Sequence, residues 1–165
     1  MFLPFYKQLV TMKEALDNAI IELKRVDHLF YVSLKYTRTV DMMLHVVQRL
    51  ANTFSFGIES LLKDAKENKK ISSIPENIAL RCKLLREIYK DERVNDYINF
   101  LIKLRKILRA NYTKREEFRR HVTMTATIDN NEIVEINIDI LKEYYEKAKE
   151  FVAFVKVIVH GEEEL

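Results

Sequence analysis

The sequence predicts a mainly α-helical protein, a helical bundle of about five helices with one β-hairpin inserted before the last helix. The chain of 165 residues contains only two glycines and two prolines, so turns must be few and helices long. Apolar residues recur every three or four positions in most segments, and they alternate with polar residues in one segment only. The length fits a single domain with helices at 1–35, 38–66, 74–89, 93–111 and 139–160 and a hairpin at 119–138.

The first third of the chain carries the clearest helical pattern. Apolar residues lie three or four positions apart over residues 9–30, and the same pattern resumes over residues 40–61. A single helix through both segments would be about 80 Å long, which is too long for a compact domain unless it pairs with another chain. We therefore expect two antiparallel helices with a break at residues 36–39, where Thr37 and Thr39 are acceptable N-caps.

The next two helices follow a loop. The segment KDAKENKKISS is charged and polar without any period, which is typical of a loop. Ser73, Pro75 and Glu76 then have the spacing of a capping box with proline in the first turn, so the third helix is predicted to begin near Ile74. The fourth helix places its apolar residues inward, and this leaves one basic outer face: Lys103, Arg105, Lys106 and Arg109.

The only strand signal follows the fourth helix. Over residues 121–128, apolar residues alternate with threonines, which is typical of a half-buried strand. The Asp-Asn-Asn at 129–131 favours a turn, and residues 133–138 supply the partner strand. The last helix ends at Gly161, and its segment 151–159 is apolar on nearly every side. A small bundle rarely encloses a helix completely, so we expect a homodimer that uses this segment as its interface.

The composition favours an intracellular protein. Cys82 is the only cysteine, so no internal disulfide forms and a reducing compartment is expected. The N-terminal segment lacks the regions of a signal peptide, and no segment has the roughly 18 uncharged apolar residues of a membrane span. We therefore expect a cytoplasmic protein with no membrane partner. Many lysines, glutamates and isoleucines beside only two glutamines, Gln8 and Gln48, are typical of a thermophile.

Residues for metal, cofactor or nucleophilic chemistry are scarce. Asp41 and His45 lie one helical turn apart, but zinc or iron needs three or four such ligands, so we predict no metal site. Cys82 is expected to be a small buried side chain rather than a nucleophile. The only glycines, Gly57 and Gly161, cannot form a glycine-rich phosphate loop, and no cofactor is expected.

Charge is distributed unevenly along the chain. The net charge is +3, but residues 103–128 carry eight basic residues against two glutamates, and residues 129–165 carry ten acidic residues against four lysines. The two segments could attract each other in the fold, or the basic one could face an anionic partner such as RNA. Tyr112 and Phe118 lie among the basic residues and could stack on bases. The candidate nucleic-acid-binding residues are Lys103, Arg105, Lys106, Arg109, Lys114, Arg115, Arg119 and Arg120.

Residues 115–121 read Arg-Glu-Glu-Phe-Arg-Arg-His. Together with the long paired helices, this segment resembles the Arg-x4–6-His pattern of the HEPN superfamily. The resemblance implies a small, usually dimeric all-α protein, and many members are metal-independent ribonucleases of toxin–antitoxin or defence systems. It also implies that the two residues meet across the dimer, with His121 as general acid/base on a 2′-hydroxyl and Arg115 stabilising the phosphorane charge.

Three hypotheses on function stay open at this point. The first is a non-catalytic, HEPN-like binding module that contacts RNA or a protein partner through the basic surface of residues 103–120. The second is a metal-independent endoribonuclease that uses Arg115 and His121. The third is a dimerising scaffold whose basic face is neutralised by its own acidic last helix.

Overall fold

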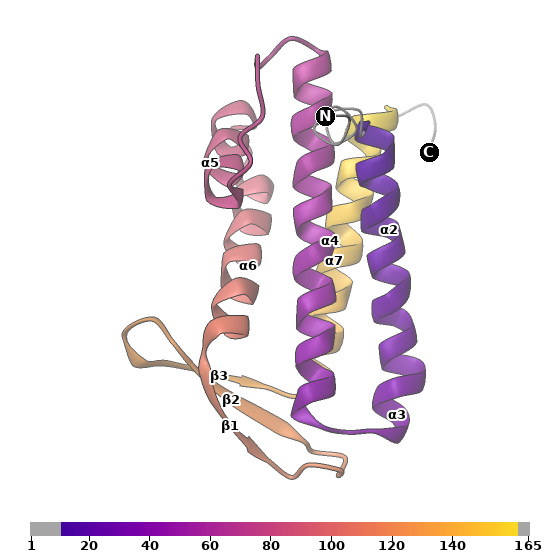
Figure 1. Ribbon diagram of the computed structural model, residues 1–165, viewed down its shortest axis with the longest axis vertical. Helices are drawn as coiled ribbons and strands as arrows, with labels where there is room; N and C mark the ends of the chain where they lie inside the picture. The colour runs from indigo at the N-terminus through magenta and orange to yellow at the C-terminus, as the bar shows by residue number, and fades with distance from the viewer. Residues whose placement is uncertain (1–10, 162–165) are drawn as a thin grey trace, which may run out of the picture.

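The computed structural model describes residues 11–161 and confirms a mainly α-helical fold with a small antiparallel sheet before the last helix (Figure 1). The elements are α2 (Met12–His28), α3 (Leu34–Tyr36), α4 (Val40–Glu67), α5 (Ile78–Ile88), α6 (Glu92–Arg109), β1 (Asn111–Arg115), β2 (Thr123–Ile128), β3 (Glu132–Ile136) and α7 (Ile138–His160). Three long helices, α2, α4 and α7, lie side by side; α5 and α6 cover one flank, and the sheet lies across one end of the bundle. Within the described residues, no helix is long and apolar enough to cross a membrane.

Helices α2 and α4 are the antiparallel pair predicted from the first third of the chain. α2 continues through a π-helical turn (Leu29–Ser33) into α3, and the helix then breaks at residues 37–39. Thr39 caps α4, because its Oγ1 accepts a hydrogen bond from the Met42 N–H at 3.2 Å. The prediction of two helices is therefore confirmed. The part of the first helix expected over residues 1–10 lies outside the described residues.

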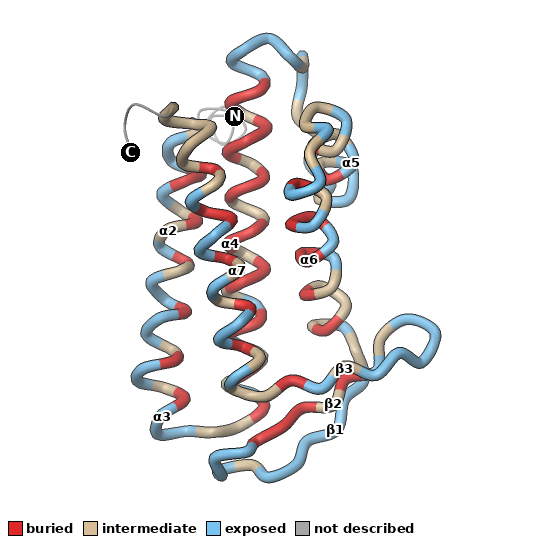
Figure 2. Tube along the Cα trace, turned by 180° about the vertical axis from the view of Figure 1, so that it is seen from behind, coloured by how far each residue is buried: buried red, intermediate tan, exposed pale blue. Residues whose placement is uncertain are grey.

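Helix α4 is the centre of the molecule and carries buried residues along its whole length (Figure 2). It packs against α2, α5, α6 and α7. α7 packs mainly on α4 and α2, so Phe151 and Val155 are buried, while Ala153 is exposed and Phe154 and Val157 are half-buried. The apolar segment of α7 is thus covered on one side within the chain, and the homodimer expected from it stays a prediction.

Aromatic rings fill the space between α4, α6 and α7. Phe54 of α4 stacks on Phe151 of α7 with ring centroids 4.7 Å apart, and Tyr97 of α6 lies 4.9 Å from Phe151. Gly57 lets α7 approach this closely, since a Cβ atom on that residue would lie 2.3 Å from the Phe151 ring. This glycine is needed for close packing between two helices.

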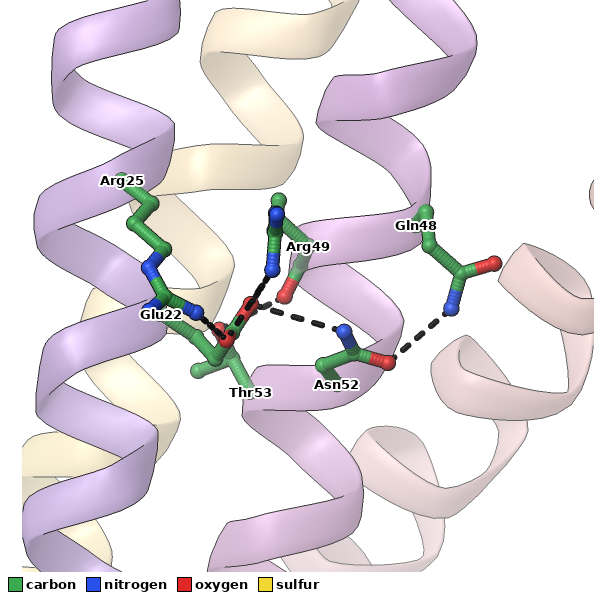
Figure 3. A network of polar contacts seen from close by, with 6 residues as sticks. All are labelled: Glu22, Arg25, Gln48, Arg49, Asn52 and Thr53. Atoms are coloured by element: carbon green, nitrogen blue, oxygen red, sulfur yellow. Dashed lines mark hydrogen bonds and ion pairs between the residues drawn. The ribbon is translucent and has the colours of Figure 1, made fainter.

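A buried carboxylate joins α2 to α4 (Figure 3). Glu22 is only 4 % exposed, and its oxygens accept hydrogen bonds from Arg25 at 2.7 Å, Arg49 at 3.3 Å and Asn52 at 3.4 Å. Gln48 extends the network by donating a hydrogen bond to Asn52. Because a buried charge is costly without its partners, the network favours the one register of α2 against α4 in which all of them meet.

The third helix begins later than the sequence predicted. α5 starts at Ile78, because the Asn77 side chain accepts hydrogen bonds from the N–H groups of Ala79 and Leu80 and caps the helix. The predicted start near residue 74 was therefore wrong. The preceding segment is not helical, and the Arg81 side chain holds it by donating a hydrogen bond to the Pro75 carbonyl at 2.6 Å.

The sheet contains one strand more than the predicted hairpin. β2 and β3 pair as expected, with Met124 opposite Ile136, and the alternating residues Val122, Met124 and Ala126 are fully buried. β1 adds to the other edge of β2, with Arg115 opposite Thr123. All five residues of β1 are exposed, so this strand has no apolar alternation that could reveal it. Because β1 begins at Asn111, the fourth helix, α6, ends at Arg109, two residues before the predicted limit at 111.

Candidate functional site

A polar hollow of about 450 Å³ lies at the end of the bundle that carries the sheet. Three segments that are distant in sequence form it: the connection between α3 and α4, the loop between β1 and β2, and the first turns of α7. Its lining residues are Arg38, Arg115, Glu116, Arg120, His121, Thr123, Asn137, Ile138, Asp139 and Lys142. We call this site the basic hollow, because four arginines and lysines outnumber two carboxylates.

Backbone and side-chain hydrogen bonds dock the β1–β2 loop onto the start of α4. The Phe118 N–H donates to the Arg38 carbonyl at 2.7 Å, and the Glu117 carboxylate accepts from the Val40 N–H at 3.2 Å. A carboxylate is favourable there, because the N-terminus of a helix carries a partial positive charge. Glu117 also pairs with Lys114 at 3.4 Å, and this hydrogen-bonded contact raises the pKa of the lysine. The docked loop brings Arg38 into the basic hollow beside the loop's own cations.

The β1–β2 loop holds two residues in a backbone conformation that side chains disfavour. Glu116 has φ 55° and Phe118 has φ 66°, and both lie in the left-handed region. Phe118 is also 74 % exposed, although it is a large aromatic residue. Strain combined with an exposed ring is unfavourable in the isolated protein, and such features concentrate at functional sites. The ring stands on the same short loop as Arg119 and Arg120.

The N-terminus of α7 adds to the positive potential of the basic hollow. Asn137 caps this helix by accepting a hydrogen bond from the Ile140 N–H at 2.8 Å, and both Asn137 and Lys142 line the hollow. The unpaired N–H groups and dipole of a long helix favour an anion at this end. Glu116 and Asp139 oppose this potential, but the four cations and the helix end outweigh them, so the hollow has the chemistry of a site for a phosphate or a similar anion.

Arg115 and His121, the pair singled out by the HEPN-like pattern, both line the basic hollow within one chain. Arg115 reaches across the sheet to form an ion pair with Glu135 at 3.1 Å, and both side chains are more than half exposed. His121 is exposed in the loop, and its backbone carbonyl accepts a hydrogen bond from the Thr123 hydroxyl at 2.8 Å. Both residues thus line the hollow from the end of β1 or from the loop that follows it, and both are accessible to solvent.

The eight predicted nucleic-acid-binding residues do not form one surface. Lys103 lies 5.7 Å from the ring of Tyr144 on the α7 side of α6. Three other residues of α6 line a separate groove against α5: Arg105, Lys106 and Arg109. The remaining four belong to β1 and its following loop: Lys114, Arg115, Arg119 and Arg120. Within the part of the chain that the structure describes, Lys106 pairs with Asp129 and Arg115 with Glu135, so these counter-charges come from the β2–β3 turn and from β3, and not from α7.

Sequence reasoning missed two cations of the basic hollow. Arg38 lies in the break before α4 and Lys142 lies on α7, and nothing near either residue in the sequence connects it with the β1–β2 loop.

Asp41 and His45 are exposed, and no cluster of three potential metal ligands occurs among residues 11–161. The chain matches no protein-family model, no curated protein and no solved structure.

Proposed function

We propose that the protein is a binding module for single-stranded RNA. In this proposal the basic hollow holds a backbone phosphate, and the exposed Phe118 ring stacks on a neighbouring base. The observation that carries the proposal is the meeting of Arg38, Arg115, Arg120 and Lys142 in one hollow, because the β1–β2 loop that lines it also carries the exposed Phe118 ring. Phosphate contacts supply most of the affinity of such proteins, and aromatic stacking accepts any base.

A metal-independent endoribonuclease is the second candidate. It is favoured by one observation, namely that Arg115 and His121 line the same basic hollow. The His121 imidazole would accept the proton of a 2′-hydroxyl as that oxygen attacks the adjacent phosphorus, and later protonate the leaving 5′-oxygen. Arg115 would stabilise the negative charge that develops on the phosphorane. These are the roles that the HEPN resemblance implies.

The purified protein incubated with end-labelled single-stranded RNA in EDTA tests both candidates. We expect a shifted band on a native gel, intact RNA on a denaturing gel, and binding that falls steeply with salt. Arg120→Gln should reduce the slope of log affinity against log salt by about one, because it removes one phosphate contact. Cleavage that disappears in His121→Ala would instead favour the ribonuclease. If the RNA is neither shifted nor cut, both the RNA-binding and the ribonuclease proposals are wrong. The hypothesis of a dimerising scaffold would then be favoured.

Phe118→Gly should weaken RNA binding and stabilise the fold, two effects of opposite sign. Loss of stacking should cost about 1–3 kcal/mol, or roughly 5- to 150-fold in affinity. Glycine adopts positive φ without strain, so the free energy of unfolding should rise by up to about 1 kcal/mol. Fluorescence anisotropy and urea unfolding measure the two effects.

Ile133→Ala is the matched control for this variant, because Ile133 is an exposed apolar residue on β3 outside the basic hollow. Its RNA affinity should equal that of the wild-type protein. Equal affinity in Phe118→Gly as well would contradict the stacking role of Phe118.

A further inference from the structure

A groove of about 440 Å³ runs between α5 and α6. The two helices contribute to it in the same way. The lining residues have the same spacing on both helices. On α5 they are residues 78, 79, 82, 83 and 86, and on α6 they are residues 101, 102, 105, 106 and 109. This spacing marks one face of a helix over two turns, about 12 Å in length. Two such faces side by side form the kind of channel in which a third helix packs.

The floor of the groove is apolar, and part of it is exposed at Ile102 and Ala79. Cys82 and Leu101 lie at its base, and Ile102 beside them is 37 % exposed. Burial raises the pKa of the Cys82 thiol, so this residue serves as a small apolar side chain and not as a nucleophile. Of the eleven residues of α5, only Cys82 and Leu85 are buried, and the others are half-buried or exposed (Figure 2).

The rim of the groove is positively charged. Five of the ten lining residues are cations, and none of the ten is an acid: the cations are Lys83, Arg86, Arg105, Lys106 and Arg109. Of these, Lys106 is paired with Asp129 outside the groove. The five cations come from both helices, so positive charge flanks the apolar floor on two sides. The arrangement complements a ligand with an apolar face and carboxylates along both edges of that face.

We propose that this groove binds an acidic amphipathic helix of a partner protein. The partner helix would place apolar residues at i, i+3 or i+4, and i+7 on the floor, with Asp or Glu beside them facing the rim. A nucleic-acid backbone would use the cations but would leave the exposed side chains of Ile102 and Ala79 without apolar contact. A peptide that binds as an added strand would need a free sheet edge, and an extended polyproline peptide would need aromatic residues, none of which lines this groove.

The groove and the basic hollow are separate sites. The groove lies on the flank formed by α5 and α6, and the hollow lies at the end of the bundle beside the β1–β2 loop (Figure 1). They have no lining residue in common. The peptide proposal therefore does not rest on the proposed RNA function, and either one can fail without the other.

A displayed library of random peptides about 16 residues long, selected on the full-length protein, tests the proposal. We expect enriched sequences with the apolar spacing above and flanking Asp or Glu. A synthetic copy should bind Arg105→Glu/Arg109→Glu about tenfold more weakly or worse, with a similar loss for Lys83→Glu/Arg86→Glu on the opposite wall. Two double variants are used so that a folding defect in one, checked by thermal unfolding, leaves the other decisive. Arg120→Glu in the basic hollow is the matched control and should bind the peptide normally.

Several outcomes would overturn the proposal. They are the absence of enriched peptides, enriched peptides without acidic residues, and equal binding by both double variants. Displacement of a fluorescent fatty acid from the groove without any selected peptide would assign it to an acyl ligand instead. RNA binding that is lost in Arg105→Glu/Arg109→Glu and kept in Arg120→Glu would assign the groove to nucleic acid.

Discussion

Gly57→Ala should lower the free energy of unfolding by about 2–3 kcal/mol, although alanine normally stabilises the interior of a helix by about 1 kcal/mol relative to glycine. The new Cβ atom would lie 2.3 Å from Cε2 and 2.9 Å from Cζ of Phe151. The ring cannot move aside, because Phe54 stacks on it and Tyr97 packs against it. Helix α7 must therefore shift away from α4, and the aromatic contacts between them weaken.

A double-mutant cycle with Phe151→Leu identifies the cause. Leucine is smaller than the phenylalanine ring, so Gly57→Ala/Phe151→Leu should be less destabilised than the sum of the single variants by about 1 kcal/mol or more. Urea unfolding followed by circular dichroism measures all four proteins. Ser55→Ala, at a half-buried position of the same helix, is the control and should change stability by less than about 0.5 kcal/mol. A Gly57→Ala protein as stable as the wild type would show that the α4–α7 contact is looser than the structure indicates.

The elements that were predicted correctly are those that bury one face. α4 repeats its apolar residues with a helical period over almost its whole length, and β2 alternates apolar residues with threonines. β1 was not predicted because both of its faces are exposed. Its sequence therefore lacks the alternation of apolar and polar residues that identifies a half-buried strand. The start of α5 was predicted wrongly because the sequence contains two candidate N-caps, Ser73 and Asn77. Asn77 is the cap in the structure, since its side chain accepts hydrogen bonds from two backbone N–H groups.

The candidate site was predictable only where its residues are close in sequence. Arg115 and His121 share one loop region, whereas Arg38 and Lys142 reach the basic hollow through tertiary packing. The single basic face expected on the fourth helix fails for a geometric reason. Positions two apart on a helix point in nearly opposite directions, so Lys103 faces α7 while Arg105 faces α5.

Replacing Arg25 and Arg49, the two arginines that pair with Glu22, should be the most destabilising change in the network between α2 and α4. Glu22 is 4 % exposed in the wild-type protein, and Arg25→Ala/Arg49→Ala leaves its carboxylate with Asn52 as the remaining hydrogen-bond partner. Removing one partner of a buried ion pair leaves the other charge buried without compensation, and this lowers the free energy of unfolding by about 3–5 kcal/mol. Each single variant should cost less, because the other arginine still contacts the Glu22 carboxylate.

The converse change separates the buried charge from packing. The double variant keeps the Glu22 carboxylate and loses both arginines that pair with it. Adding Glu22→Gln to the double variant should therefore restore about 2 kcal/mol or more, since the cost of burying an unpaired charge disappears. Urea unfolding at neutral pH measures the series. If the triple variant were no more stable than the double variant, the loss would come from the arginine side chains packing over α2 and α4, and the carboxylate would not be what holds the two helices in register.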